Sequence, residues 1–289
     1  MFHTINDNSF ACMMNYPVFH YPKGYPAQKT VFAKIDRLII CVAVFSLFFL
    51  PHTGHAQGTI ETIDISQALG NRYYDAVEYL EKNTWIYDTL VKANISPELA
   101  FSVVFPSLTR YTAIRDIMET SAMRTLYVQS GRKYAKYTVG RFQMKPSFAE
   151  LVERNVIKYK LWDYKFKTQN NPKARSERAR RLDSPDWQVQ YLILYIKVMD
   201  KRFSHIKWKT PQDKVRFYST AYNVGFNKNE RTIKYMMSKR SLLRSSRDAK
   251  SRLRHGDVAV WFFENDCRKF KSDIPIIPKP VEGQQTQSK

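Results

Sequence analysis

Three short segments of the chain carry the side chains best suited to chemistry on a polar ligand. The first, residues 95–107, reads ISPELAFSVVFPS and ends in Ser107. The second, residues 139–147, reads VGRFQMKPS and contains Gln143, and the third, residues 219–225, reads STAYNVG. The hydroxyl of Ser107 cannot serve as a proton-donating acid, because it has no acidic pKa near neutrality. Any acid catalysis would therefore need a carboxyl group from elsewhere.

Glu119 is the leading candidate for such a carboxyl group. It lies between apolar neighbours that could raise its pKa. An acidic residue near a helix start is also favoured for structural reasons alone, and that alternative stays open. Asp116 is a weaker candidate, expected to be paired or solvated. Glu150 and Glu153 follow the second segment and are expected on the surface of a helix.

We expect no metal site and no bound cofactor. His205 and His255 lie far apart in the sequence, and Cys267 is the only cysteine after residue 56. The chain contains neither a Gly-rich phosphate-binding loop nor a Gly-x-Ser-x-Gly motif.

The spacing of apolar residues predicts an all-α domain with at most a short β segment. The predicted helices span residues 71–93, 97–105, 114–129, 186–203 and 211–223. Ser96 should cap the second of these, and Pro106 should end or kink it. Gly131 should cap the third. The fourth is apolar over a wide sector and is expected in the middle of the domain. Residues 134–145 are predicted to form a short strand or a tight loop.

In this order, the three segments resemble motifs of the lytic transglycosylases and goose-type lysozymes. Residues 95–107 are similar to the helix that ends at the family's catalytic glutamate. Residues 139–147 are similar to its Gly-x-x-Gln-x-x-Pro stretch, and residues 219–225 to its Ala-Tyr-Asn-x-Gly motif. The resemblance covers about residues 95–226 and implies a lysozyme-like helical domain that binds the glycan strands of peptidoglycan. Its groove would be framed by the chain around Phe105, the Gln143 turn and the helix end at Tyr222.

The resemblance also implies roles for single residues. Gln143 would hydrogen-bond the glycan or orient the acid, Tyr222 would donate its hydroxyl to the acid or to an N-acetyl group, and Asn223 would fix the loop or the sugar. Ser107 occupies the position of the family's acid and would line the substrate site. Either cleavage has been lost and glycan binding retained, or Glu119 has taken over as the acid. Outside this family, Gln143 would cap its loop and Tyr222 would be a core aromatic.

Residues 1–56 have the pattern of a leader with a secretory signal. Basic residues precede an uncharged apolar run over residues 38–50, and small residues follow before a cleavage point at about Ala56. We therefore expect export to the periplasm or cell envelope, with a retained N-terminal anchor as the alternative. The predicted organisation is a leader (1–56), an N-terminal helical extension (57–94), a lysozyme-like domain (95–273) and a disordered tail (274–289).

The chain is strongly basic, with 47 Lys and Arg against 26 Asp and Glu and a formal net charge of +21. Basic side chains gather in residues 157–181 and 228–254, and aromatic residues interleave with the lysines of the first block. Such a mixture could grip stacked bases or sugar rings, or its aromatic rings could simply turn inward.

This charge predicts an anionic partner. For an exported protein, that partner is peptidoglycan with its peptide carboxylates, or another anionic component of the envelope. The competing interpretation is a noncatalytic envelope protein whose basic faces bind an acidic partner. Nucleic acid is not predicted as a partner, because the sequence contains no recognisable nucleic-acid-binding module.

Overall fold

The structure of the chain, a computed structural model, describes residues 64–239 and 253–270. The predicted leader, the alternative anchor and the predicted tail lie outside these ranges. The described residues are mostly helical and contain no strand, which confirms the all-α class. In chain order the helices are α2 (Ile65–Leu69), α3 (Asn71–Lys82), α4 (Trp85–Lys92), α5 (Pro97–Leu108), α6 (Ala113–Ala122), a π-helical turn (Met123–Tyr127), α7 (Val128–Ser130), α8 (Pro146–Tyr159), α9 (Pro172–Leu182), α10 (Pro185–Arg202), α11 (Pro211–Val224), α12 (Glu230–Ser238) and α13 (His255–Asn265).

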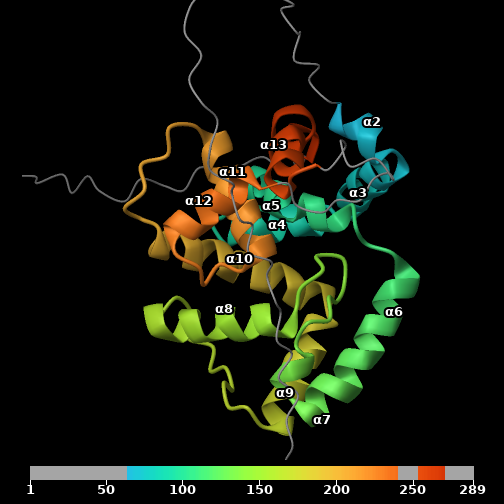
Figure 1. Ribbon diagram of the computed structural model, residues 1–289, viewed down its shortest axis with the longest axis vertical. Coiled ribbons are helices and arrows are strands. Elements are labelled where there is room, and N and C mark those ends of the chain that lie inside the picture. Colours follow the sequence, from blue (N-terminus) through green and yellow to red (C-terminus); the bar gives the residue numbers. More distant parts are fainter. Residues whose placement is uncertain (1–63, 240–252, 271–289) are drawn as a thin grey trace, which may run out of the picture. The chain divides into compact units, whose positions relative to one another are not determined.

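Helix α5 is buried over almost its whole length and packs against α11 and α13 (Figure 1). Its start is the predicted one, because Ser96 Oγ accepts a hydrogen bond from the Leu99 amide at 3.1 Å and Pro97 follows the cap. The helix ends at Leu108, two residues beyond Pro106. Ser107 therefore lies in the last turn of a buried helix.

The single helix predicted over residues 71–93 is divided into α3 and α4. Asn83 lies at the break, where its side chain donates to the Tyr79 carbonyl at 2.7 Å and accepts from Trp85 Nε1 at 3.1 Å. These bonds give the chain an alternative to continued helical hydrogen bonding. The predicted apolar spacing still describes both helices, since the apolar residues of α3 and of α4 are buried in the same core.

Helix α6, the π-helical turn and α7 follow one another without interruption over the helix predicted for residues 114–129. They end at Gly131, whose φ of 83° is the positive value expected of a glycine cap. Helix α6 has no buried residue, and its Ile117 and Met118 side chains are 68% and 67% exposed.

Residues 134–145 form a tight loop rather than a strand. An isolated bridge joins Val139 and Met144, whose amides each donate to the other's carbonyl, at 2.9 and 3.0 Å. Residues 138–145, called the Gln143 loop below, lead directly into α8. Figure 1 shows this loop between α6 and the helices at the centre of the structure.

The expectation that Glu150 and Glu153 lie on the surface is wrong. Both are on the buried side of α8, and Glu153 is 0% exposed. Glu153 accepts hydrogen bonds from Arg178 Nε at 2.9 Å and Arg181 Nη2 at 3.0 Å, and from the Tyr191 hydroxyl at 2.6 Å. This buried network joins α8, α9 and α10. A carboxylate is tolerated in the core because cations and a hydroxyl surround it.

Candidate functional site

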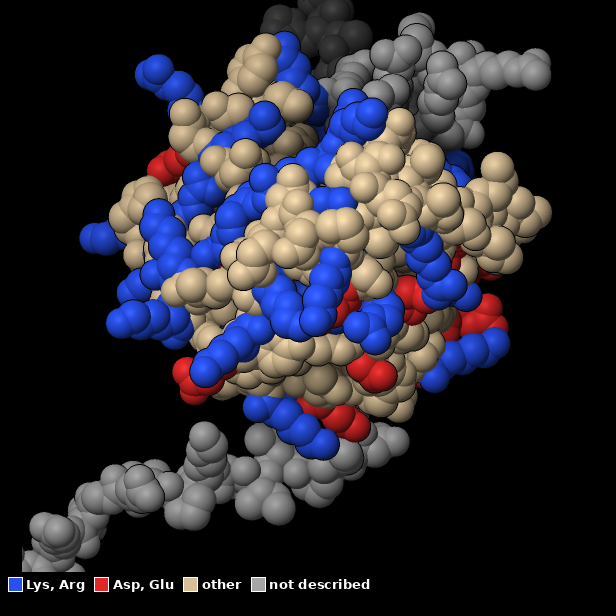
Figure 2. Space-filling model, turned by 90° about the horizontal axis from the view of Figure 1, so that it is seen from below, with Lys and Arg blue, Asp and Glu red and all other residues tan. Residues whose placement is uncertain are grey.

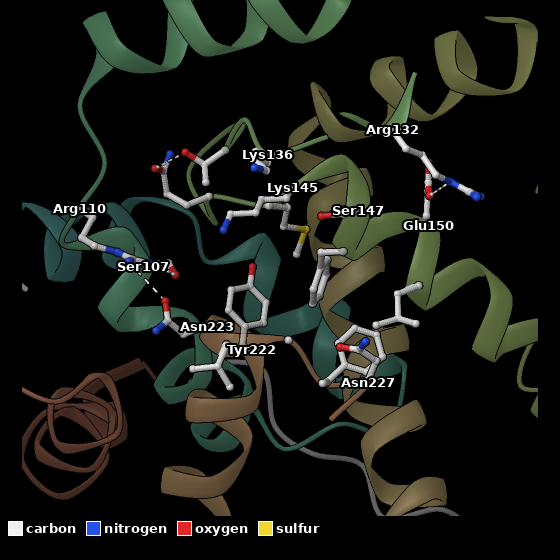
Figure 3. Close-up of a pocket in the computed structure, with 18 of the residues that line it drawn as sticks. Ser107, Arg110, Arg132, Lys136, Lys145, Ser147, Glu150, Tyr222, Asn223 and Asn227 are labelled. Atoms are coloured by element: carbon white, nitrogen blue, oxygen red, sulfur yellow. Dashed lines mark hydrogen bonds and ion pairs between the residues drawn. The ribbon is translucent and has the colours of Figure 1, made fainter. Parts of the chain in front are cut away.

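A pocket of about 800 Å³ is lined by residues from all three segments that the sequence singles out (Figure 3). Ser107 and Arg110 come from the end of α5 and the turn after it, Gln143 and Lys145 from the Gln143 loop, and Tyr222 from the end of α11. Further lining residues are Arg115, Arg132, Lys136, Thr138, Met144, Ser147, Phe148, Glu150, Leu151, Arg154, Asn223, Val224, Gly225, Phe226 and Asn227. The structure thus brings together Ser107, Gln143, Tyr222 and Asn223.

Tyr222 joins α11 to the Gln143 loop. Its hydroxyl donates to the Phe142 carbonyl at 2.8 Å, and its ring packs edge-on against Phe148, 4.9 Å between centroids. Burial raises the pKa of the Tyr222 hydroxyl, which therefore keeps its proton at neutral pH. The satisfied hydroxyl fits the interpretation as a core aromatic, and the residue lines the pocket at the same time.

Gln143 uses its amide within its own loop. The side-chain Nε2 donates to the Gly140 carbonyl at 2.9 Å, and Oε1 lies 3.1 Å from Thr138 Oγ1. The residue is 8% exposed and has a φ of 52°, a value that few non-glycine residues adopt. These contacts are those of a loop cap, and they hold Gln143 at the pocket wall.

Glu119 anchors the Gln143 loop and is not among the residues that line the pocket. Its carboxylate accepts from Arg115 Nε at 2.6 Å and from both the amide and the hydroxyl of Thr138. Burial alone would raise the pKa of Glu119, but these hydrogen bonds and the Arg115 charge outweigh it and lower the pKa. The shift is opposite to the one expected, because Thr138 and Arg115 stabilise the ionised carboxylate of Glu119 by more than burial destabilises it.

Two further side chains hold the same loop. Asp116 Oδ1 accepts from the Gly140 amide at 2.6 Å, so α6 contributes a second anchoring carboxylate. Gln188, buried on α10, accepts from the Phe142 amide at 3.1 Å and donates to the Leu182 carbonyl at 2.7 Å. The sequence analysis missed Gln188, although a glutamine within so apolar a helix is a signal that a buried polar contact exists.

Arg110 and Lys145 were also missed, and both line the pocket. Arg110 Nη2 donates to Ser107 Oγ at 3.3 Å, and Nη1 donates to Asn223 Oδ1 at 3.4 Å. Desolvation lowers the pKa of Arg110 and, together with the nearby Arg110 charge, that of Lys145. The signal was available, because Arg110 lies three residues after Ser107 and Lys145 lies within the second motif.

The pocket wall is strongly cationic. Six of its lining residues are Lys or Arg, and Glu150 is its single carboxylate among the described residues. Glu150 accepts from the Tyr127 hydroxyl at 2.8 Å and from Arg132 Nε at 2.7 Å, so both its oxygens are engaged. Figure 2 shows Lys and Arg spread over the face seen there, where they outnumber Asp and Glu. The arrangement favours an anionic or strongly hydrogen-bonding ligand.

The aromatic residues of the first basic block divide between core and surface. Phe166 is 7% exposed, whereas Trp162 and Tyr164 are each 38% exposed and stack with their centroids 5.0 Å apart. Trp162 also packs on Trp187 of α10. The prediction that these rings turn inward is therefore confirmed for Phe166 and in part for Tyr159, which packs against the core. Trp162 and Tyr164 form a half-exposed aromatic surface.

Within residues 64–239 and 253–270, no group of three or more His, Cys, Asp or Glu side chains is placed to hold a metal ion. In the same residues, no helix is both long enough and apolar enough to span a membrane.

Comparison of the chain with protein-family models, with curated protein sequences and with solved structures gives no match.

Proposed function

We propose that this is an exported protein of the cell envelope whose lysozyme-like domain binds peptidoglycan glycan strands in the pocket without cleaving them. The observation that carries the proposal is the meeting of three sequence segments in one pocket. Ser107, Gln143 and Tyr222 lie far apart in the chain, and the resemblance to lytic transglycosylases and goose-type lysozymes requires them to share a groove.

The absence of an available acid supports binding without cleavage. Breaking a glycosidic bond requires a carboxylic acid that protonates the leaving oxygen. Serine occupies position 107, the lowered pKa of Glu119 keeps it ionised, and the oxygens of Glu150 are taken by Tyr127 and Arg132. None of these carboxyl groups is placed as a proton donor within the described part of the chain.

The remaining pocket surface suits amino sugars. Ser147 and Asn227 offer hydroxyl and amide groups, and Phe148 and Leu151 offer apolar surface. Sugar rings present hydroxyls at their rims and C–H groups on their faces, so a site that mixes such groups can hold them.

The experiment is co-sedimentation of the purified protein with isolated sacculi, followed by analysis of the soluble fragments. We expect the protein to sediment with the sacculi and to release no anhydro-muropeptides. Ser147→Trp places an indole in the pocket from an exposed position at the start of α8. We expect it to weaken binding about tenfold, or roughly 1.4 kcal/mol.

Ser121→Trp is the matched control, because Ser121 is an exposed helical serine outside the pocket. It should bind sacculi like the wild type. Release of anhydro-muropeptides by the wild type would contradict binding without cleavage, and full binding by Ser147→Trp would contradict this use of the pocket.

A second candidate function is that of a noncatalytic basic envelope protein that binds an acidic partner through its charged faces. The net charge of +21 favours it. Binding of this kind would be lost at high salt and would be unaffected by Ser147→Trp, because no pocket is needed.

A further inference from the structure

Arg110 is a cation without a carboxylate partner in the part of the chain that the structure describes. Its two contacts, to Ser107 Oγ at 3.3 Å and to Asn223 Oδ1 at 3.4 Å, are long and involve neutral groups. Its Nε is buried and makes no hydrogen bond. Buried donors are almost always satisfied, and a charge that is partly removed from water, as in Arg110, is costly without a counter-charge. The guanidinium is therefore arranged for an acceptor that the surrounding residues do not supply.

Position 107 explains why the acceptor is missing. The side chain there lies one helical turn before Arg110, within reach of its guanidinium. A carboxylate at this position would neutralise the cation, but the serine hydroxyl offers only a neutral oxygen. The charge that balances Arg110 has to come from outside the described chain.

Lys145 adds a second positive charge to the same end of the pocket. Figure 3 shows its side chain extending over the pocket toward the side where Arg110 and Ser107 lie. Its amine makes no hydrogen bond or ion pair with any residue that the structure describes. Arg115 differs from these two residues because Glu119 pairs with it at 2.6 Å. An anion between Arg110 and Lys145 would relieve their mutual repulsion and supply acceptors to both.

We propose that the Arg110 and Lys145 end of the pocket binds a carboxylate carried by the glycan ligand. The inference rests on the proposed function and adds to it the chemical group of the strand that Arg110 and Lys145 recognise. The carboxylate can belong to the lactyl ether of a muramic acid residue or to a stem peptide attached there. Both present the same two-oxygen acceptor to the guanidinium.

Titration calorimetry of the purified protein with ligands of equal length tests the inference. The probes are a neutral N-acetylglucosamine tetramer, a peptide-free tetrasaccharide that alternates N-acetylglucosamine with N-acetylmuramic acid, and the same tetrasaccharide with stem peptides. We expect one or both carboxylate-bearing ligands to bind about tenfold more tightly than the neutral tetramer. If the peptide-free tetrasaccharide already binds more tightly than the neutral tetramer, the recognised carboxylate belongs to the lactyl group. If only the tetrasaccharide with stem peptides does so, the carboxylate belongs to the peptides.

Variants locate the preference. Arg110→Gln and Lys145→Met should each bring the ratio of the affinity for the preferred carboxylate-bearing ligand to the affinity for the neutral tetramer close to one. Lys158→Met is the control, because Lys158 lies on an exposed part of α8 outside the pocket, and it should keep the wild-type ratio. Ser107→Glu places a carboxylate beside Arg110 and should also remove the preference. Ser107→Gln, of the same size without the charge, should retain it. These ratios are compared only among variants whose urea unfolding shows that they are folded.

The outcomes separate this inference from the function on which it rests. Equal binding of neutral and carboxylate-bearing ligands by the wild type would overturn the carboxylate site and leave glycan binding intact. A preference that persists in both Arg110→Gln and Lys145→Met would overturn the assignment to these residues. Failure of all three ligands to bind would overturn the proposed function and the inference together.

Discussion

Gly140→Ala should abolish glycan binding and lower the free energy of unfolding by about 4 kcal/mol, from backbone strain and lost buried hydrogen bonds. Gly140 has a φ of 69°, and a Cβ added there would lie 1.5 Å from Gln188 Nε2. Gln188 would have to move and give up its bonds to the Phe142 amide and the Leu182 carbonyl, at 3.1 and 2.7 Å. The Gln143 loop would lose its buried anchor. Urea unfolding and sacculus co-sedimentation measure the two effects.

Gly70→Ala is the control that separates the effect of backbone strain from the effect of the steric clash with Gln188. Gly70 also has a positive φ, 56°, but a Cβ added there meets nothing within 4 Å. Gly70→Ala should lower the free energy of unfolding by roughly 2 kcal/mol less than Gly140→Ala does, because no buried hydrogen bond is lost. Sacculus binding should be retained. Equal losses of stability in the two variants, or full binding by Gly140→Ala, would show that Gln188 does not fix the loop.

Arg178→Met should lower the free energy of unfolding by about 3 to 5 kcal/mol, because it leaves a buried carboxylate without its main counter-charge. Arg178 is 1% exposed and donates to Glu153 from both Nε and Nη2, at 2.9 and 2.5 Å. It also donates to the Tyr127 hydroxyl at 2.7 Å. Burial opposes its charge, but the contacts to Glu153 outweigh this and raise the pKa of Arg178. Urea unfolding of the purified variant measures the loss.

Arg180→Met is the control for Arg178→Met, because Arg180 is exposed on the same helix. It should change the free energy of unfolding by no more than about 0.5 kcal/mol. In the double variant Arg178→Met with Glu153→Gln, the free energy of unfolding should fall by less than the sum of the decreases in the two single variants. Removing both charges leaves neither of them unpaired. If Arg178→Met unfolds like Arg180→Met, the buried network does not stabilise the core.

The helices that begin with a local signal could be predicted from the sequence. Ser96 and Pro97 mark the start of α5 because capping depends on neighbouring residues. Helix α9 also begins with a cap and a proline, Asn171 and Pro172, but it lacks an apolar stripe, because arginines (175, 178 and 181) occupy much of its buried side. Arginines are normally exposed, and only acceptors contributed by other helices make this face stable in the core. No periodicity rule assigns such a helix its buried side.

Some features of the candidate site could likewise be predicted from the sequence, and others could not. Its three segments could be found because their residue types and order are visible in the sequence. The orientation of Glu119 could not, since it depends on how α6 packs beside the Gln143 loop and on bonds to Thr138. The significance of Arg110 was hidden for another reason. It follows from a partner that is missing around the folded side chain, and spacing along the chain does not reveal this.

The measurement that tests the account most directly is a set of amide NMR spectra of the protein recorded during titration with a peptidoglycan tetrasaccharide. We predict saturable shift changes centred on Arg110, Lys145 and Asn223, which lie within or next to the three chain segments that line the pocket. Changes confined to the aromatic surface of Trp162 and Tyr164, or no changes at saturating ligand, would contradict a glycan site in this pocket.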